Sequence, residues 1–295
     1  MKKLFLTSVV LLMAVMAQAQ TKITPKLQKG FKAVYTEVAT NNAGGIEQKV
    51  TSETEYVVSD VTADGAVIDI TMTSIDAGQA DNGPMGKLMS LSESVMKGVC
   101  IKVRTDAEGQ VKGVVNLDEV KAKVIQLAGS IVDEIMKESP EVSQALPKDV
   151  LMSQFSEQLT EESLIASLTN SGVLALNGKT VRNGATESVN NEQGMKLKRM
   201  YFVVGKNIIT NSTLDMTKDE LKEFVLKQVE KVAPDQAEMV KQNIDAVMGQ
   251  MSFNVTSKST YEMQDNGWVK SIKTEASQDS MGQSVKQTSE ITLKQ

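Results

Sequence analysis

The chain contains no histidine, and its 295 residues include a single cysteine, Cys100. Without histidine, catalytic triads that use an imidazole base are excluded. Most zinc sites are excluded as well, because they need histidine or clustered cysteine. A single cysteine also excludes a disulfide within the chain. These absences favour a binding or structural protein over an enzyme, and they predict neither a cofactor nor a metal site.

Aromatic residues are scarce, with one Trp, four Tyr and six Phe against 17 Met. Methionine fills irregular gaps in a core and adapts to varied apolar partners. The methionines therefore have two interpretations: ordinary core filling, or a deformable apolar cavity between sheet and helices that suits a lipid tail or a signal-peptide-like segment. The predicted lining of such a cavity is Met89, Met96, Leu127, Ile131, Ile135, Phe224 and Met248.

Long hydrophobic runs are missing except at the start of the chain. Lys2 and Lys3 precede an apolar stretch over residues 4–17, and Ala17-Gln18-Ala19 has the small-x-small pattern of a cleavage site. The pattern predicts a signal peptide over residues 1–19, cleaved between Ala19 and Gln20. The apolar stretch is shorter than the ~20 residues of a membrane span. We therefore expect an exported protein with no transmembrane segment after signal removal, in the periplasm, on the outer-membrane surface or outside the cell.

Positive charge is in short supply. The chain has 32 Lys and Arg against 37 Asp and Glu, a formal net charge of −5, and loss of Lys2 and Lys3 with the signal makes it −7. Nucleic-acid binding depends on neutralising phosphates with basic side chains. The charge balance therefore argues against nucleic acid as a partner and favours solubility.

The residues that are present form repeated alternating patterns. The same hairpin pattern, two alternating stretches around a turn with Asp, Asn or Gly, occurs over 56–70, 101–115 and 261–272. Alternation with a period of two indicates strands with one wet face, and short turns between them favour antiparallel pairing. The predicted strands lie over 30–76, 178–216 and 252–294, with a further hairpin over 100–115.

Helical patterns separate these strand blocks. Leu117, Val120 and Val124 begin an apolar stripe with spacings of three and four, which is typical of an amphipathic helix. Thr217 followed by Glu220 forms a capping box at the start of another helix. The predicted helices lie over 86–98, 117–170 and 217–250.

Grouped strands and grouped helices predict an α+β fold rather than βαβ repeats. We expect a large curved antiparallel sheet, an incomplete barrel, with the amphipathic helices packed on its concave face. The signal peptide is followed by a single domain over 20–295, and two domains divided near residue 177 are the alternative.

Three short motifs resemble catalytic or phosphate-binding patterns. Gly178-Lys179-Thr180 lacks the earlier glycine of a phosphate loop. Ser94 and Lys97 match the S-x-x-K pattern of serine acyl enzymes, but the partner elements of those enzymes are missing. Glu161 and Glu162 are a carboxylate pair at a helix start. The leading hypothesis is binding of an apolar ligand, such as a lipid, or of an envelope protein; the alternatives are a surface interaction protein whose sheet edge recruits another chain and a histidine-independent hydrolase.

Several segments resemble an uncharacterised exported family of Bacteroidota. They are "AQAQ" at the end of the signal, "LQKGFKAVYTEV", "DNGWVKSI" and the last strand "SEITLKQ". The resemblance implies export and no assigned activity. Asp279-Ser280-Met281 resembles the acceptor triplet of protein O-glycosylation in Bacteroidota, which implies modification of Ser280. The order of elements is also similar to that of periplasmic lipoprotein carriers, whose half-barrel wraps helices around an apolar hollow.

Overall fold

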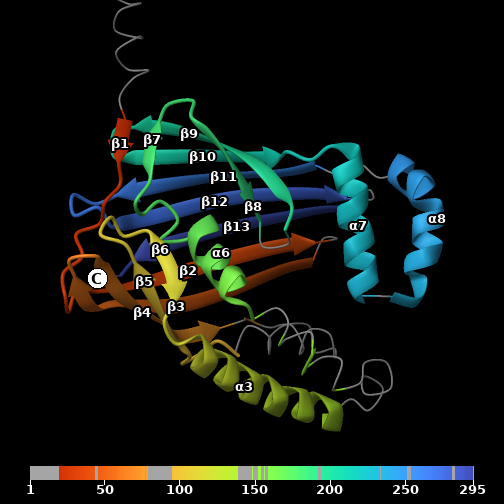
Figure 1. Cartoon of the computed structure of the whole chain (residues 1–295), viewed down its shortest axis with the longest axis horizontal. Helices are drawn as coiled ribbons and strands as arrows, with labels where there is room; N and C mark the ends of the chain where they lie inside the picture. The colour runs from red at the N-terminus through yellow and green to blue at the C-terminus, as the bar shows by residue number, and fades with distance from the viewer. Residues whose placement is uncertain are drawn as a thin grey trace, which may run out of the picture.

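Eleven strands pair in one antiparallel sheet whose order is β6-β5-β4-β3-β2-β13-β12-β11-β10-β9-β8 (Figure 1). The pairing of β13 with β2 joins the first and last strand blocks of the chain in this sheet. The strands are β2 Lys32–Ala43, β3 Ile46–Thr62, β4 Gly65–Asp76, β5 Cys100–Thr105, β6 Val111–Val114, β8 Thr186–Asn190, β9 Lys196–Val204, β10 Asn207–Leu214, β11 Asn254–Met263, β12 Val269–Ser280 and β13 Gln283–Leu293.

The structure is a computed structural model, and it describes only part of the chain. The described residues are 20–43, 46–76, 78, 95–138, 148, 152–153, 156, 159–191, 194–232, 234–250, 254–280 and 283–294. Most of the helix predicted over 86–98, the segment between the helical parts of 117–170, and the signal peptide lie outside these residues.

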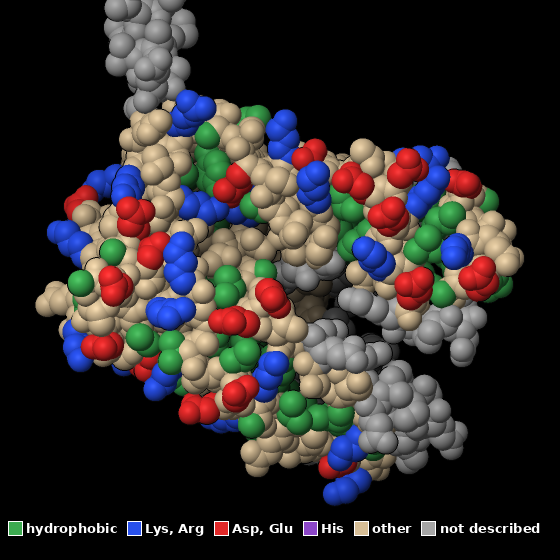
Figure 2. Space-filling model, viewed as in Figure 1, with side chains coloured by type: hydrophobic (Ala, Val, Ile, Leu, Met, Phe, Trp, Pro, Cys, Tyr) green, Lys and Arg blue, Asp and Glu red, His purple; other side chains and the backbone are tan. Residues whose placement is uncertain are grey.

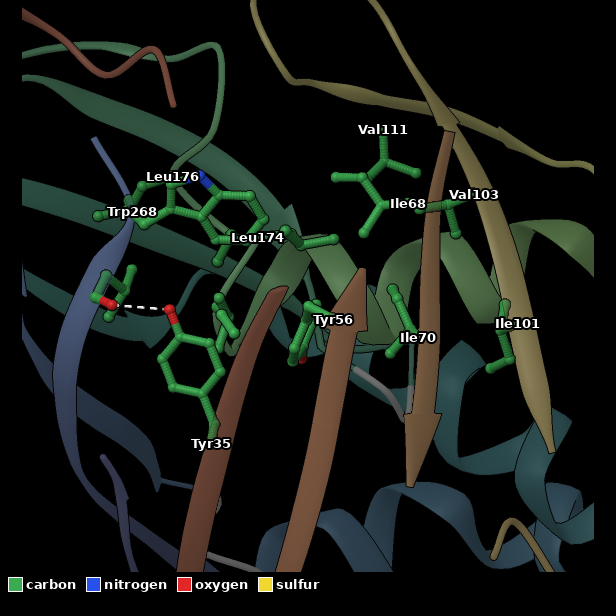
Figure 3. Close-up of a cluster of buried hydrophobic side chains, with 14 of the residues drawn as sticks. Tyr35, Tyr56, Ile68, Ile70, Ile101, Val103, Val111, Leu174, Leu176 and Trp268 are labelled. Carbon is green, nitrogen blue, oxygen red and sulfur yellow. Dashed lines mark hydrogen bonds between the residues drawn. The ribbon is translucent and has the colours of Figure 1, made fainter. Parts of the chain in front are cut away.

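One face of the sheet carries the hydrophobic core. On β2, Ala33 and Tyr35 are buried whereas Lys32 is exposed, as alternation requires for a strand with one wet face. The inward-facing side chains of eight other strands of the sheet join them around Trp268. Leu174 and Leu176, from the segment before β7, fill the middle (Figure 3). The Tyr35 hydroxyl donates a 2.7 Å hydrogen bond to the Val269 carbonyl, which ties β2 to β12.

Helix α6, Glu161–Asn170, connects the two edges of the sheet. At its start, Glu161 Oε1 accepts a 2.8 Å hydrogen bond from the Val114 backbone N–H of edge strand β6. At its end, the Asn170 side chain donates a 2.6 Å bond to the Asn190 carbonyl of edge strand β8. Eleven flat strands would hold these edges roughly 48 Å apart, whereas the ten-residue helix is only about 15 Å long. The sheet is therefore curled into an open barrel, and α6 spans the gap (Figure 1).

The other helices of the described part of the chain divide into two groups. Helix α3, Leu117–Glu138, packs beside β5 and buries Val120, Val124 and Ala128 in the core. Helices α7, Lys218–Val232, and α8, Pro234–Gln250, pair with each other and are inserted between the neighbouring strands β10 and β11.

The placement of α7 and α8 differs from the expectation that every helix covers the concave face. The pair lies at one end of the sheet (Figure 1). The reason is that the apolar stripe of α7 has two other partners, α8 and a small second cluster of Met195, Leu197 and Val255. The fold class is nevertheless as predicted, α+β with a large antiparallel sheet that does not close.

The opposite end of the barrel is closed by the segment that precedes β2. Strand β1, Gln20–Lys22, pairs with β7, Thr180–Arg182, in a two-stranded sheet. The Lys26 backbone N–H donates to the Asn266 carbonyl, 2.8 Å, and the Trp268 indole N–H donates to the Lys26 carbonyl, 3.2 Å. These bonds hold the segment before β2 across the end of the barrel that lies away from α7.

Candidate binding face

The inward-facing side of the sheet changes character along the strands. Near the closed end it is apolar. Beyond Tyr35 and Ile272, on the side of α7, the inward positions become mostly polar and uncharged. We call this half the polar inner face. Its two clearest rows run across β10, β11, β12, β13, β2 and β3, namely Thr210, Ser259, Thr274, Ser289, Ala39 and Val50, followed by Ser212, Ser257, Ala276, Gln287, Asn41 and Gln48.

Several hydroxyl groups along these rows are hydrogen-bonded to neighbouring side chains. Ser259 Oγ and Thr274 Oγ1 lie 2.9 Å apart across β11 and β12. Ser289 Oγ donates a 2.7 Å hydrogen bond to Glu37 Oε1 across β13 and β2. Because a hydroxyl can both donate and accept, such a row can adapt to a ligand with either kind of polar group.

The polar inner face is not filled in the way that the core is. Thr210, Ser212 and Ser259 are buried, but Thr274, Ser289 and the other row members on β12, β13, β2 and β3 are half-buried or exposed. Figure 2 shows a recess in the molecular surface between α6 and α7. Small apolar side chains, Ala39 and Ala276, alternate here with the hydroxyls, so the surface is mixed rather than purely polar.

Two acceptors on β2 stand out on this face. Glu37 is half-buried and, among the described residues, has a hydrogen bond from Ser289 but no ion pair with Lys or Arg. Asn41 Oδ1 is buried and has no hydrogen-bond partner in the part of the chain that the structure describes. Burial raises the pKa of the Tyr56 hydroxyl, and the negative charge of Glu37 raises it further. Glu37 therefore acts electrostatically on the inside of the barrel.

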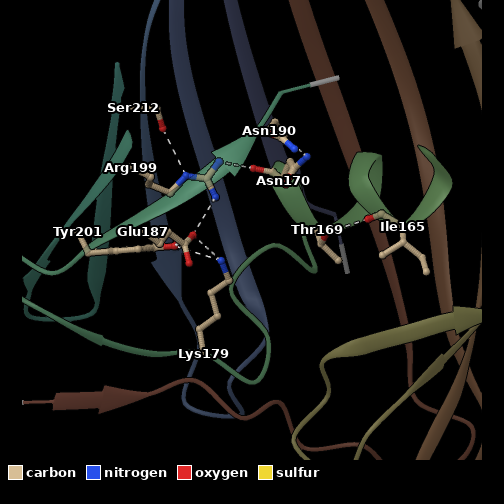
Figure 4. Close-up of polar contacts among 9 residues, drawn as sticks. All are labelled: Ile165, Thr169, Asn170, Lys179, Glu187, Asn190, Arg199, Tyr201 and Ser212. Atoms are coloured by element: carbon tan, nitrogen blue, oxygen red, sulfur yellow. Dashed lines mark hydrogen bonds and ion pairs between the residues drawn. The ribbon is translucent and has the colours of Figure 1, made fainter. Parts of the chain in front are cut away.

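A charged network borders the polar inner face at β8 and β9 (Figure 4). Glu187 Oε1 lies 2.6 Å from Lys179 Nζ and 3.6 Å from Arg199 Nη1, and it accepts a hydrogen bond from the Tyr201 hydroxyl. Arg199 also donates to the Asn170 carbonyl, 2.7 Å, at the end of α6. The network therefore stabilises the fold, because it connects α6, the segment before β7 and the edge of the sheet.

The network shifts the pKa values of its members in opposite directions. Burial raises the pKa of Glu187, but hydrogen bonds from Lys179 and Tyr201 and the charges of Lys179 and Arg199 outweigh it, so the net shift is downward. Burial and the hydrogen bond to Glu187 raise the pKa of Tyr201. Each group is thus held in the form that the network uses, an ionised carboxylate and a protonated phenol.

Replacing Glu187 by Gln is expected to destabilise the protein by about 2 kcal/mol, because Lys179 and the nearly buried Arg199 lose their counter-ion; this value is below that for a fully buried pair since Glu187 is partly exposed. The folded-state pKa of Glu187 is lowered, so the stabilisation is complete above its unfolded pKa of about 4.3 and is lost as the pH falls through the folded value. The measurement is the free energy of unfolding in urea of the wild-type protein and of Glu187→Gln, at neutral and at acidic pH. A difference that stays constant as the pH falls below about 4 contradicts the assignment.

The residues predicted to line an apolar cavity are spread over several sites. Met96 and Leu127 are half-buried against the main core, Phe224 packs on the second cluster, and Met248 is buried in α8. The backbones of Ile131 and Ile135 belong to α3 and that of Ser280 ends β12, but the side chains of these three residues, like the whole of Met89 and Ala19, lie outside what the structure describes. Gln20 begins β1. A shared lining by these residues stays a prediction.

The polar inner face was missed because its residues resemble a solvent-facing side. Ser and Thr at alternate positions are typical of the solvent-facing side of a strand. They are identified as inward-facing only because they lie on the same side of the sheet as Tyr35 and Ile291. A sequence signal does exist: on β2, the inward register that begins with Ala33 and Tyr35 continues through Glu37, Ala39 and Asn41.

The short catalytic-looking motifs have structural roles where they are described. The Gly178 backbone N–H donates to the Ile23 carbonyl, 2.8 Å, and Lys179 pairs with Glu187, so neither group is available to a phosphate. Glu161 accepts the Val114 N–H at the sheet edge. Ser94 lies outside the described residues.

The described part of the chain offers neither a metal site nor a helix that could span a membrane. No three His, Cys, Asp or Glu side chains of the described residues are grouped so that they could hold a metal ion. None of the described helices combines the length and apolar character that crossing a membrane would need.

No family model matches the chain, and no curated protein matches it. Among solved structures, the chain is similar to lipovitellin, in a structure concerned with its lipid–protein interactions. The sequences are 10% identical, and the TM-score is 0.41. The match covers 92% of this chain but 26% of the lipovitellin chain, so this chain spans about a quarter of that protein. A similarity of this size carries no argument about function.

Proposed function

We propose that the chain is an exported, non-catalytic binding protein that holds an amphipathic ligand with a large apolar part, such as a lipid, on the polar inner face. The observation that carries the proposal is the incomplete burial of inward-facing positions on β12, β13, β2 and β3 of a curled sheet. Export rests on the signal-like pattern of residues 1–19.

The mixed chemistry of the face supports an amphipathic occupant. Ligand sites are concave, mostly apolar, and carry a few polar groups that orient the ligand. The polar inner face continues directly from the apolar core, where Ile291 and Leu293 are only partly buried, into the rows of hydroxyls. An apolar chain would lie toward the core, and a polar end would reach the hydroxyls.

The proposal is tested with a matched pair of tryptophan substitutions on β13. Gln287 and its neighbour Thr288 are both exposed, but Gln287 faces inward, opposite Ala276, and Thr288 faces outward. We expect the native protein to bind an environment-sensitive hydrophobic dye, and Gln287→Trp to weaken binding about tenfold, or ~1.4 kcal/mol, by filling the hollow. Thr288→Trp is expected to leave dye affinity unchanged.

Fluorescence titration of the three folded proteins gives the result. Dye binding that develops only after denaturation, or equal losses in the two tryptophan variants, contradicts the proposed function. Circular dichroism of each variant separates a filled site from a damaged fold.

A further inference from the structure

One carboxylate that faces the inside of the barrel has no cation in contact with it among the described residues. In the eleven described strands, the inward-facing acidic side chains are Glu37 and Glu187, and the inward-facing basic one is Arg199. Arg199 is already paired with Glu187, which Lys179 also contacts. Glu37 is therefore a half-buried carboxylate without a cationic partner among the described residues, and it places an uncompensated negative charge on this part of β2.

Two hydrogen-bond acceptors on β2, Glu37 and Asn41, have few or no donors among the described residues. An ionised carboxylate only accepts hydrogen bonds, and Ser289 supplies one donor to Glu37. Asn41, four residues further along β2 and on the same side, has a buried Oδ1 that receives no hydrogen bond from the described residues. Leaving a buried acceptor unpaired is costly, so both positions favour a ligand that brings hydrogen-bond donors.

From these two observations, and resting on the proposed function, we infer that the polar part of the ligand bears hydrogen-bond donors and carries no negative charge. A hydroxyl-bearing group, as in a monoacylglycerol, or an ammonium group meets both conditions. An anionic carboxylate or phosphate group meets neither, because it would face Glu37 and would add acceptors where donors are missing.

The test compares three amphiphiles with the same alkyl chain in displacing the hydrophobic dye: a monoacylglycerol, an alkylammonium and a fatty acid. We expect the fatty acid to bind about tenfold more weakly than the other two, since a second negative charge would lie within several ångströms of Glu37. Glu37→Gln keeps the shape and the acceptor for Ser289 while removing the charge, and it is expected to close most of the tenfold gap.

Two further variants make the comparison sharp. Glu290→Gln removes a carboxylate from the outer face of β13, where it pairs with Lys273, and should leave the gap unchanged. Asn41→Asp adds a carboxylate on the polar inner face and should widen the gap. This second inward variant gives an answer with the opposite sign, so a folding defect in Glu37→Gln does not leave the inference untested.

The outcomes separate this inference from the proposed function. If the wild-type protein binds the dye but prefers none of the three amphiphiles, or if Glu37→Gln and Asn41→Asp leave the gap unchanged, the inference is overturned while the proposed function stands. If the folded wild-type protein takes up neither dye nor amphiphile, both are overturned.

Discussion

Raising the pH above about 10 is expected to unfold this protein in one step, with its tyrosines ionising together rather than one by one. The chain has four tyrosines, and all of them are buried: Tyr35, Tyr56, Tyr201 and Tyr261. Burial raises the pKa of each one. The ionised form of Glu37 adds to the shift at Tyr56, and the hydrogen bond to Glu187 adds to it at Tyr201.

The size of the effect follows from the number of tyrosines. A raised folded-state pKa means that the folded protein keeps protons that the unfolded chain releases above pH 10, so stability is complete below that pH and falls as the pH rises. Each tyrosine lowers the free energy of unfolding by about 1.4 kcal/mol per pH unit, so the four together lower it by roughly 5–6 kcal/mol per pH unit. Since domains are stable by about 5–15 kcal/mol, we expect unfolding before about pH 12.

Tyrosinate absorbance and far-ultraviolet circular dichroism, followed in one alkaline titration, measure this effect. The two signals should change together. Tyr201→Phe, which removes one phenol and leaves the aromatic ring, should reduce the pH dependence of the unfolding free energy by about a quarter. Ionisation of two or more tyrosines near pH 10 in a protein that is still folded would show that the core is open to water.

Substituting Ala for Gly65 is expected to cost about 3–5 kcal/mol of stability. Gly65 has a φ of +151°, which residues with a side chain rarely adopt, and a Cβ at this position would lie 1.9 Å from the Thr105 carbonyl oxygen. The contact joins the β3–β4 turn to the end of β5, so the backbone itself would have to move.

Gly184→Ala is the matched control for this prediction. Gly184 also has a positive φ, +74°, but its Cβ would meet nothing within 4 Å, so only the backbone conformation is penalised, by about 1 kcal/mol. Thermal unfolding should show a fall in Tm of about 10 °C for Gly65→Ala and a few degrees for the control. Equal falls in Tm for the two variants would mean that the β3–β4 turn at Gly65 does not contact the end of β5 at Thr105.

Alternation in the sequence was enough to predict the strands and the fold class. The capping box of α7 was also readable: the Thr217 backbone N–H donates to Glu220 Oε2, 2.7 Å, and the Glu220 N–H donates to Thr217 Oγ1, 3.2 Å. Each of these features depends on residues that are close in the chain, which is why a pattern in one sequence can reveal it.

Features that depend on distant residues were not predictable. Asn116 directly precedes α3 and is of a residue type that often caps helices. Its side-chain oxygen, however, accepts from the Lys102 N–H, 2.8 Å, and so holds β5. The bridge that α6 makes between β6 and β8 joins Glu161 and Asn170 to partners 47 and 20 residues away. No rule of sequence spacing connects such pairs. In the same way, only the register of β2 in the sheet shows that Glu37 faces the inside of the barrel.

The most direct test of the central claim, that the polar inner face holds an amphipathic ligand, is native mass spectrometry of the protein purified without detergent from the cells that produce it. The account predicts a non-covalent adduct whose released mass is that of a neutral or cationic amphiphile, lost or diminished in Gln287→Trp and retained in Thr288→Trp. A natively folded protein that carries no adduct, and takes up none when incubated with monoacylglycerol or alkylammonium, would contradict it.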